Sequence, residues 1–396
     1  MQSSPSTTLS CGRYLTALLR AELRGEQPPE KPEDVSFEEL YRMAKRHGLE
    51  TMSYDAVSKL RTLPEDDLWT RWRASRDANS AKNMVQRTHR DRILTELSRK
   101  GIDVLPLKGS LLIEMYPKPD QRQMSDLDIL IRGEQREQVR QCMTELGYHV
   151  DRFEVTNEDT YSQKPFMHIE MHHQLFAVIS SFSQLRDYYS DPWIRSIPDE
   201  GMEHRYHFSW EDYYIYLLAH LYKHFSGGGS GIRNVMDIYV FLRQHGESLD
   251  RMYLQKELNK IGLDDFRQTM ERLAEQWFGD NGQKTSTVEE EIEETIFTSG
   301  AYGMRSSSRL HNIQRMEEKY SSELIGKMAY LIRLVFPSYD RIIVKYPQFK
   351  GKQKILPLLW IYHIGYKILF DRERISGNIK AIIEYGNASD GKGEDE

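Results

Sequence analysis

Residues 105–132, LPLKGSLLIEMYPKPDQRQMSDLDILIR, constrain the fold of this 396-residue chain more than any other stretch. An apolar run at 104–107 ends at a Lys-Gly-Ser sequence, and a second apolar run follows directly. This order predicts a strand, a tight turn and the start of a helix. Further on, Asp126 and Asp128 alternate with apolar residues, which predicts a strand that carries both carboxylates on one face and apolar side chains on the other.

The residue types in this stretch indicate phosphate chemistry. Two carboxylates side by side on a strand face repel each other unless a cation lies between them, and hard oxygen ligands suit Mg²⁺. Backbone N–H groups at a helix start, here at Gly109 and Ser110, can hold an anion. A phosphate cradle beside a Mg²⁺ site suggests nucleotide chemistry.

A later segment, residues 166–173, alternates in the same way and adds a third carboxylate. The pattern places His168, Glu170 and His172 on one strand face. Glu170 is therefore interpreted as a third metal ligand, and the alternative is an exposed strand carboxylate. Three histidines beside a carboxylate would also suit Zn²⁺, but His173 points away from His172, and the paired aspartates prefer a harder ion. His172 is then a hydrogen-bonding neighbour of the metal ligands or an ordinary packed residue.

Composition limits the classes of protein that fit. With 39% hydrophobic and 29% charged residues the chain matches a soluble globular protein, and its net charge of −6 gives no support to general nucleic-acid binding. Two cysteines are too few for a disulfide framework or a thiolate metal site, which favours a reducing cytoplasm. The first residues lack the apolar core of a secretory signal. The apolar segment 355–370 is short for a spanning helix, which needs ~20 mostly apolar residues, and it predicts a buried or groove-lining helix rather than membrane contact.

The order of the elements predicts an α+β fold, with a small mixed sheet between two helical regions. We expect an N-terminal helical region at 1–100, an α/β core at 101–198, a C-terminal helical domain at 199–386 and a disordered acidic tail at 387–396.

Several local signals refine this division. A capping box at Ser36 begins one helix, and a long helix is expected from about residue 65 to residue 100, with Met84 among its core contacts. Residues 157–165 are predicted to form a turn region, and the glycine run 227–231 to interrupt a helix. A further helix is expected at 323–334.

A family resemblance rests on the motif residues Lys108, Gly109, Ser110, Tyr116, Pro117, Arg122, Ser125, Asp126, Leu127 and Asp128. Together they resemble the Gly-Ser … Asp-x-Asp signature of the polymerase-β-like nucleotidyltransferase superfamily. More narrowly, they are similar to a poorly characterised bacterial nucleotidyltransferase family with the pattern lysine-glycine, tyrosine-proline, arginine and aspartate-leucine-aspartate. The likeness covers most of the chain and extends to segments 169–172, 220–224 and 299–303. The glycine-rich run 227–231 departs from the pattern.

The resemblance implies a nucleotidyltransferase core in which Asp126, Asp128 and Glu170 bind two Mg²⁺ ions, with Mn²⁺ as a substitute. Gly109 and Ser110 would hold the β- and γ-phosphates of a nucleoside triphosphate. A nucleoside monophosphate would pass to a hydroxyl or phosphate of a small molecule, peptide or protein, and pyrophosphate would leave. The competing interpretations are a catalytically silent nucleotide-binding or partner protein that retains the fold, and a Zn²⁺ hydrolase.

Four cationic side chains are candidates for binding the nucleotide. Lys108 and Arg122 can neutralise a triphosphate, or they can form salt bridges that order the loop, with Asp120 or Asp126 as the partner. Lys223 and Arg233 lie on two predicted helices that can wall the cleft and contact the base, the phosphates or the acceptor. The alternative is a buried polar network, in which Asp237 accepts from His220 or Arg233. The glycine run between these helices is a flexible connection or a lid.

Overall fold

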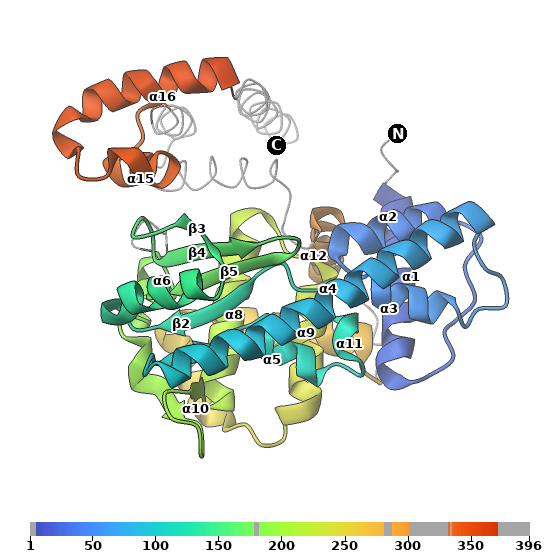
Figure 1. Cartoon of the computed structure of the whole chain (residues 1–396). Coiled ribbons are helices and arrows are strands. Elements are labelled where there is room, and N and C mark those ends of the chain that lie inside the picture. The colour runs from blue at the N-terminus through green and yellow to red at the C-terminus, as the bar shows by residue number, and fades with distance from the viewer. Residues whose placement is uncertain (1–4, 178–181, 281–286, 301–331, 333–334, 371–396) are drawn as a thin grey trace, which may run out of the picture. The chain divides into compact units, whose positions relative to one another are not determined.

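The computed structural model describes residues 5–177, 182–280, 287–300, 332 and 335–370 (Figure 1). Nearly all of the predicted helix 323–334 and the whole tail 387–396 lie outside these residues. The chain divides into two compact units. Unit 1 holds Met1–Lys223 and Ser230–Ala301, and unit 2 holds His224–Gly229 and Tyr302–Glu396.

Unit 1 begins with four helices: α1 (Pro5–Arg24), α2 (Phe37–His47), α3 (Glu50–Val57) and α4 (Asp66–Arg99). Of the predicted capping box, the N-cap is confirmed, because the Ser36 hydroxyl accepts a hydrogen bond from the Glu39 N–H at 3.2 Å. Gly48 ends α2 in the left-handed conformation, with φ at +66°. The long helix predicted at 65–100 is α4, but Met84 is 72% exposed, so its prediction as a core contact is wrong.

The larger sheet of unit 1 has five strands: β1 (Val104–Pro106), β2 (Leu127–Ile131), β3 (His149–Arg152), β4 (Glu158–Gln163) and β5 (Met167–His172). A small second sheet pairs β6 (Ser196–Pro198) with β7 (Tyr206–Phe208). The spatial order in the larger sheet is β1-β2-β5-β4-β3. The central β2–β5 pair is parallel, and the other pairs are antiparallel. This mixed sheet flanked by helices confirms the predicted α+β fold class.

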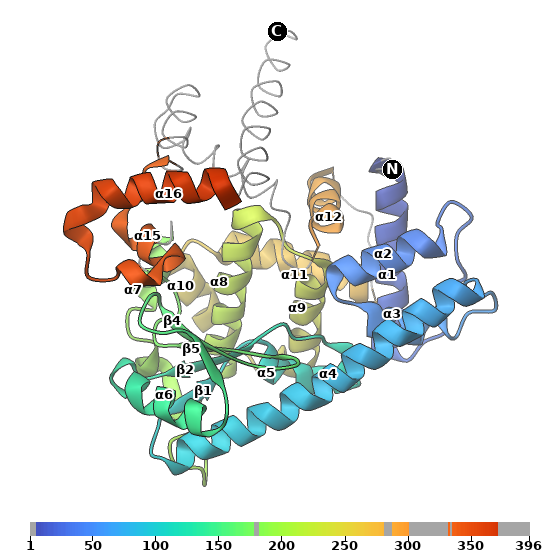
Figure 2. The same cartoon turned by 45° about the horizontal axis from the view of Figure 1, so that its top comes forward.

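One face of the sheet forms the apolar core of this region. Leu127 and Ile129 of β2 and Ile169 and Met171 of β5 are all at most 1% exposed. They pack against side chains of α4 and of α6 (Arg136–Glu145), which lie on the same side of the sheet (Figures 1 and 2). Because strand residues alternate, the residues between them must face the other way. Asp128, Glu170 and His172 therefore lie on the opposite face.

The predicted turn region at 157–165 is wrong, because most of it forms strand β4. The sequence EDTYSQ has no apolar alternation, which hides the strand. Its buried positions are Asp159 and Tyr161, both at 0% exposure. Arg136 donates to both carboxylate oxygens of Asp159, at 2.6 and 2.7 Å, and so makes burial of that charge tolerable.

After the sheet the chain returns to helix, in α8 (Trp210–Gly228), α9 (Ile232–His245), α10 (Arg251–Lys260), α11 (Asp264–Phe278) and α12 (Thr287–Ser299). The last residues of α8, from His224 on, are assigned to unit 2. The glycine run does not break the helix where it begins, since α8 continues to Gly228. The chain turns at Gly229, where φ is +102°, and Gly231 then caps the N-terminus of α9.

The described part of unit 2 includes α15 (Tyr339–Lys345) and α16 (Leu356–Phe370). A small core joins them through Ile342, Tyr346 and Leu359. Helix α16 buries one side, whereas Leu358 and Ile361 are more than 60% exposed. Among the described residues, no helix combines the length and the apolar character needed to cross a membrane.

Candidate metal centre

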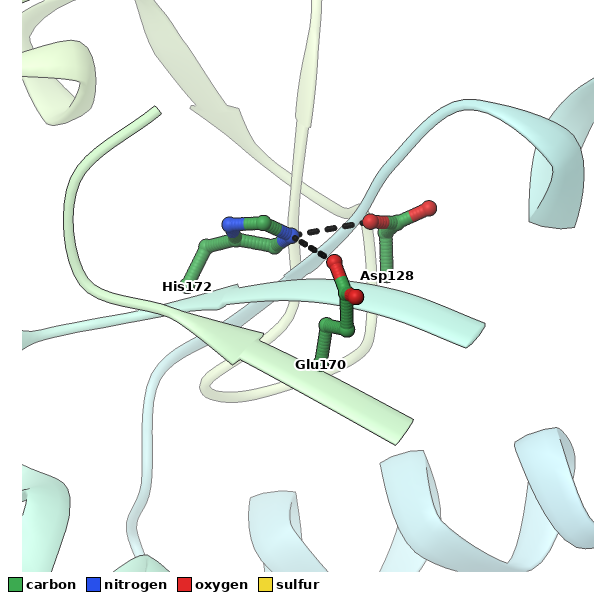
Figure 3. Close-up of side chains that lie close together, drawn as sticks. All are labelled: Asp128, Glu170 and His172. Atoms are coloured by element: carbon green, nitrogen blue, oxygen red, sulfur yellow. Dashed lines mark hydrogen bonds and ion pairs between the residues drawn. The ribbon is translucent and has the colours of Figure 1, made fainter. Parts of the chain in front are cut away.

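The polar face of the sheet brings Asp128, Glu170 and His172 together (Figure 3). Asp128 on β2 is directly opposite Glu170 on the parallel neighbour β5. His172 lies two residues after Glu170 and so shares its face. One ligand atom from each of the three side chains lies within 4.8 Å of the others, a spacing that allows one ion to contact all of them.

His172 lies between the two carboxylates. Its Nε2 is 2.8 Å from Asp128 Oδ1 and 3.3 Å from Glu170 Oε2. Its Nδ1 makes no hydrogen bond and lies 3.5 Å from Oε2 of Glu158. Burial disfavours the charged imidazole, but the contacts with Asp128 and Glu170 outweigh it and raise the pKa of His172.

Lys108 neutralises the buried Asp128 carboxylate. Its Nζ lies 2.7 Å from Asp128 Oδ1. Burial opposes the Asp128 charge, but Lys108 and His172 together lower the pKa of Asp128. Lys108 has φ +46° and ψ −121°, a conformation that glycine adopts far more easily than lysine. The Tyr213 hydroxyl of α8 donates to the Lys108 carbonyl at 2.7 Å and helps to hold it there.

Asp126 lies beside this group without being part of it. It precedes β2 by one residue, and its Oδ1 accepts from the Ser125 hydroxyl at 2.5 Å. Burial, followed by repulsion from Asp128, raises the pKa of Asp126, and Glu170 adds to the effect. The structure thus places two predicted metal ligands, Asp128 and Glu170, in contact range of one ion, with Asp126 as a third carboxylate nearby.

The donor set fits a divalent cation. It offers carboxylate oxygens from two strands and one imidazole nitrogen, all of which ligate such ions. Asp126, Asp128 and Glu170 interact electrostatically with one another and carry three negative charges when ionised, against the two positive charges of Lys108 and Lys223. A divalent cation would remove this imbalance.

Gly109 and Ser110, the predicted phosphate cradle, are the first two residues of the four-residue helix α5 (Gly109–Leu112). The Ser110 side chain is buried, and its hydroxyl donates to the Leu107 carbonyl at 2.5 Å. A Cβ added to Gly109 would lie 2.4 Å from Nη1 of Arg122. A glycine is therefore needed here for the close approach of Arg122.

Arg122 is buried and paired with Asp237 of α9. Its Nε and Nη2 donate to the two carboxylate oxygens of Asp237 at 2.7 and 2.8 Å. The Tyr116 hydroxyl donates to Asp237 Oδ1 at 2.7 Å. The prediction that Arg122 forms a salt bridge with Asp120 or Asp126 is therefore wrong, because its partner is Asp237. The interaction joins the tyrosine-proline and arginine motifs to α9.

Lys223 and Arg233 differ in their surroundings. Arg233 Nη1 donates to the Gln123 carbonyl at 3.0 Å, beside the motif loop. Lys223, on α8, has no hydrogen bond or ion pair with another described residue, but it lies in electrostatic range of Lys108, Glu158 and Glu170. Burial and then Lys108 lower the pKa of Lys223.

Three residues of the site were missed in the sequence: Glu158, Tyr213 and Tyr216. Tyr216 on α8 is buried and interacts electrostatically with Lys108 and Asp128. The spacing of Tyr213, Tyr216 and Lys223 places them on one side of a helix, and this periodicity was the available signal. Glu158 gave no comparable signal, because its strand was not recognised.

A family model described as "uncharacterised nucleotidyltransferase" matches residues 33–279, which include every residue of the site. The comparison with curated proteins and the comparison with solved structures each find no match.

Proposed function

The chain belongs to this family of uncharacterised nucleotidyltransferases, and from that premise we propose that it moves a nucleoside monophosphate from a nucleoside triphosphate to an acceptor. The acceptor group is a hydroxyl or phosphate on a small molecule, peptide or protein, and pyrophosphate is released. The observation that carries the proposal is the group Asp128, Glu170 and His172 on the polar face of the sheet.

Asp128 and Glu170 would hold the divalent cation, and Asp126 would contribute to a second ion. Two Mg²⁺ ions are the expected cofactor, with Mn²⁺ as a substitute. Such ions neutralise phosphate charge and make a hydroxyl more acidic, and so favour in-line displacement at phosphorus. Asp126 is the candidate ligand for a second ion, because it is a carboxylate in electrostatic range of Asp128 and Glu170 that lies outside the group of three.

The cationic side chains would hold the triphosphate. Lys108 and Lys223 both lie within electrostatic range of the carboxylate group. Lys223 has no ion-pair partner among the described residues and is the first candidate to receive a phosphate oxygen. Gly109 and Ser110 would add backbone donors. Arg122 and Arg233 would fix the loop that carries these groups, since both bind atoms of the protein around it.

The acceptor class follows from charge. A net charge of −6 argues against a long nucleic acid, whose binding favours a basic surface. A cytoplasmic location, free of membrane association, fits an acceptor that is a small molecule, peptide or protein.

Label transfer from α-³²P nucleoside triphosphates in cell extract tests the proposal. Wild-type protein should label an acceptor and release pyrophosphate, whereas Asp128→Asn and Glu170→Gln should lower the rate by a factor of about 100 or more, because each removes an ion ligand. Asp151→Asn is the matched control, since Asp151 lies exposed on β3 of the same sheet.

Two results would contradict the proposal. Nucleotide that binds with Mg²⁺ but is never turned over, across extracts and a broad acceptor panel, would identify a catalytically silent binding protein. Activity lost to a zinc-selective chelator and restored by Zn²⁺ alone would identify a zinc hydrolase.

A further inference from the structure

We propose that His172 is a direct ligand of the divalent cation and that it makes the centre prefer Mn²⁺ to Mg²⁺. This inference rests on the proposed function and concerns which ion serves it. The motif itself supplies only carboxylates, so a nitrogen donor is a property of this site that the motif does not predict.

The first argument is position. Nε2 of His172 lies between Asp128 Oδ1, at 2.8 Å, and Glu170 Oε2, at 3.3 Å. It therefore points at the same space as the two carboxylates (Figure 3). An ion bound by both carboxylates would lie within reach of this nitrogen, whereas Asp126 is outside the group of three.

The second argument is the carboxylate behind the ring. Glu158 on β4 is directly opposite His172 on β5. Oε1 of Glu158 accepts from Arg152 Nη2 at 2.8 Å, which turns Oε2 toward His172 Nδ1 at 3.5 Å. A carboxylate at the far nitrogen of a ligating histidine favours a proton on that nitrogen, and so leaves the near nitrogen free to bind metal.

The third argument is burial. The His172 side chain is 5% exposed, and its Nδ1 has no hydrogen bond. A buried imidazole nitrogen without a hydrogen bond destabilises the folded chain, because burial removes the hydrogen bond that it makes with water. When Nε2 binds an ion, a shorter contact between Glu158 and Nδ1 would give Nδ1 a hydrogen bond. Ion binding would therefore remove the cost of the unsatisfied nitrogen.

The choice of ion follows from the donor atoms. Mg²⁺ is bound by oxygen and keeps several of its waters. Mn²⁺ accepts carboxylate oxygen as Mg²⁺ does, and it binds N/O sites more tightly because it belongs to the transition series, where imidazole is a good ligand. Two carboxylates and one imidazole therefore favour Mn²⁺.

The test is metal binding to the full chain without nucleotide. Free Mn²⁺ is measured by electron paramagnetic resonance during titration, and Mg²⁺ affinity by its competition with Mn²⁺. Wild-type protein should bind Mn²⁺ more tightly than Mg²⁺. His172→Gln should weaken Mn²⁺ binding about tenfold or more and should weaken Mg²⁺ binding much less. Glu158→Gln should also weaken Mn²⁺ binding, by a factor of up to about ten.

A spectroscopic readout separates ligation from a structural role. Pulsed electron paramagnetic resonance of the Mn²⁺-loaded wild-type protein should show coupling to a directly bound imidazole nitrogen, and His172→Gln should abolish it. His168→Gln is the matched control, because His168 lies exposed on the same strand and face. Thermal unfolding of each variant confirms that the fold persists.

Absence of nitrogen coupling in the wild-type protein would overturn the inference, as would an equal loss of Mn²⁺ and Mg²⁺ affinity in His172→Gln. The label-transfer assay on the wild-type protein tests the proposed function separately. Transfer without nitrogen coupling would leave the function standing and reject the ligand. Nitrogen coupling without transfer would support His172 as a ligand and reject the proposed function.

Discussion

At the scale of single residues, Lys108 has the most unusual combination of properties in the site. It is a lysine with a positive φ, and its ammonium group contacts the carboxylate expected to bind an ion. Backbone strain of this kind costs of order 1–3 kcal/mol and persists where the surroundings over-determine it. Here the contacts of Lys108 with Asp128 and Tyr213 hold it in this conformation. Lys108 therefore supplies the positive charge that balances the buried Asp128 carboxylate.

This predicts opposite effects of Lys108→Met on two measurements. Divalent cations should bind about tenfold more tightly, because no ammonium group competes for Asp128. Nucleoside triphosphate should bind more weakly, because a phosphate-binding charge is lost. Metal titration and nucleotide titration measure the two effects.

Lys108→Arg is the control, since it keeps the charge. Weaker metal binding in Lys108→Met would show that the lysine supports the ion and does not compete with it.

At the scale of elements, the motif loop is held to α9 by the buried Arg122–Asp237 pair. Breaking one partner of a buried ion pair is costly, because the remaining charge is left without compensation. Gly109 supports this ion pair, because its lack of a side chain leaves the space that Nη1 of Arg122 occupies. The glycine and arginine of the motif are thus one structural unit.

Gly109→Ala should therefore lower the free energy of unfolding by roughly 1–3 kcal/mol, through the clash with Arg122 and loss of the Asp237 contact. Urea denaturation measures this change. Gly133→Ala is the matched control, since an added Cβ there would meet only ordinary contact, at 3.9 Å from His173. Equal stability of the two variants would show that the loop adapts without the ion pair.

The elements also show what sequence could predict. Strands β2 and β5 were predictable, because apolar side chains alternate along them and pack against α4 and α6. Strand β4 was not, because the buried Asp159 depends on Arg136, and the pairing cannot be read from local pattern. The partner of Arg122 was missed for the same reason: Asp237 lies far along the chain. Asp126 was expected on the strand, but β2 begins one residue later.

At the scale of the whole molecule, every residue of the candidate centre belongs to unit 1. A buried histidine helps to hold this unit together. His47 at the end of α2 accepts from the Ile232 N–H of α9 at 3.2 Å. Its other nitrogen lies 3.2 Å from the Phe297 carbonyl of α12 and must donate to it. Three helices thus meet at one neutral imidazole.

Burial lowers the pKa of His47 from 6.5 to about 3. Between these values the unfolded chain binds a proton that the folded chain does not, so stability is full above pH 6.5 and falls as the pH drops. The loss should reach about 2 kcal/mol by pH 5. Urea denaturation at pH 7 and pH 5 measures it.

His47→Gln should flatten this part of the pH profile, although it also loses stability at pH 7. His149→Gln is the control, because His149 is exposed on β3. A profile that keeps its slope in His47→Gln would assign the acid sensitivity to other groups.

The pairing of β2 with β5 links metal binding to the stability of the folded protein in a cell. Asp128 and Glu170 come from strands separated along the chain by α6, β3 and β4, so the candidate ion-binding group forms only when β2 and β5 have paired. An ion that binds the folded chain alone adds stability by mass action, about 2.7 kcal/mol when its concentration is 100 times its dissociation constant. Cellular metal supply would then set how long the protein survives proteolysis, as well as how fast it works.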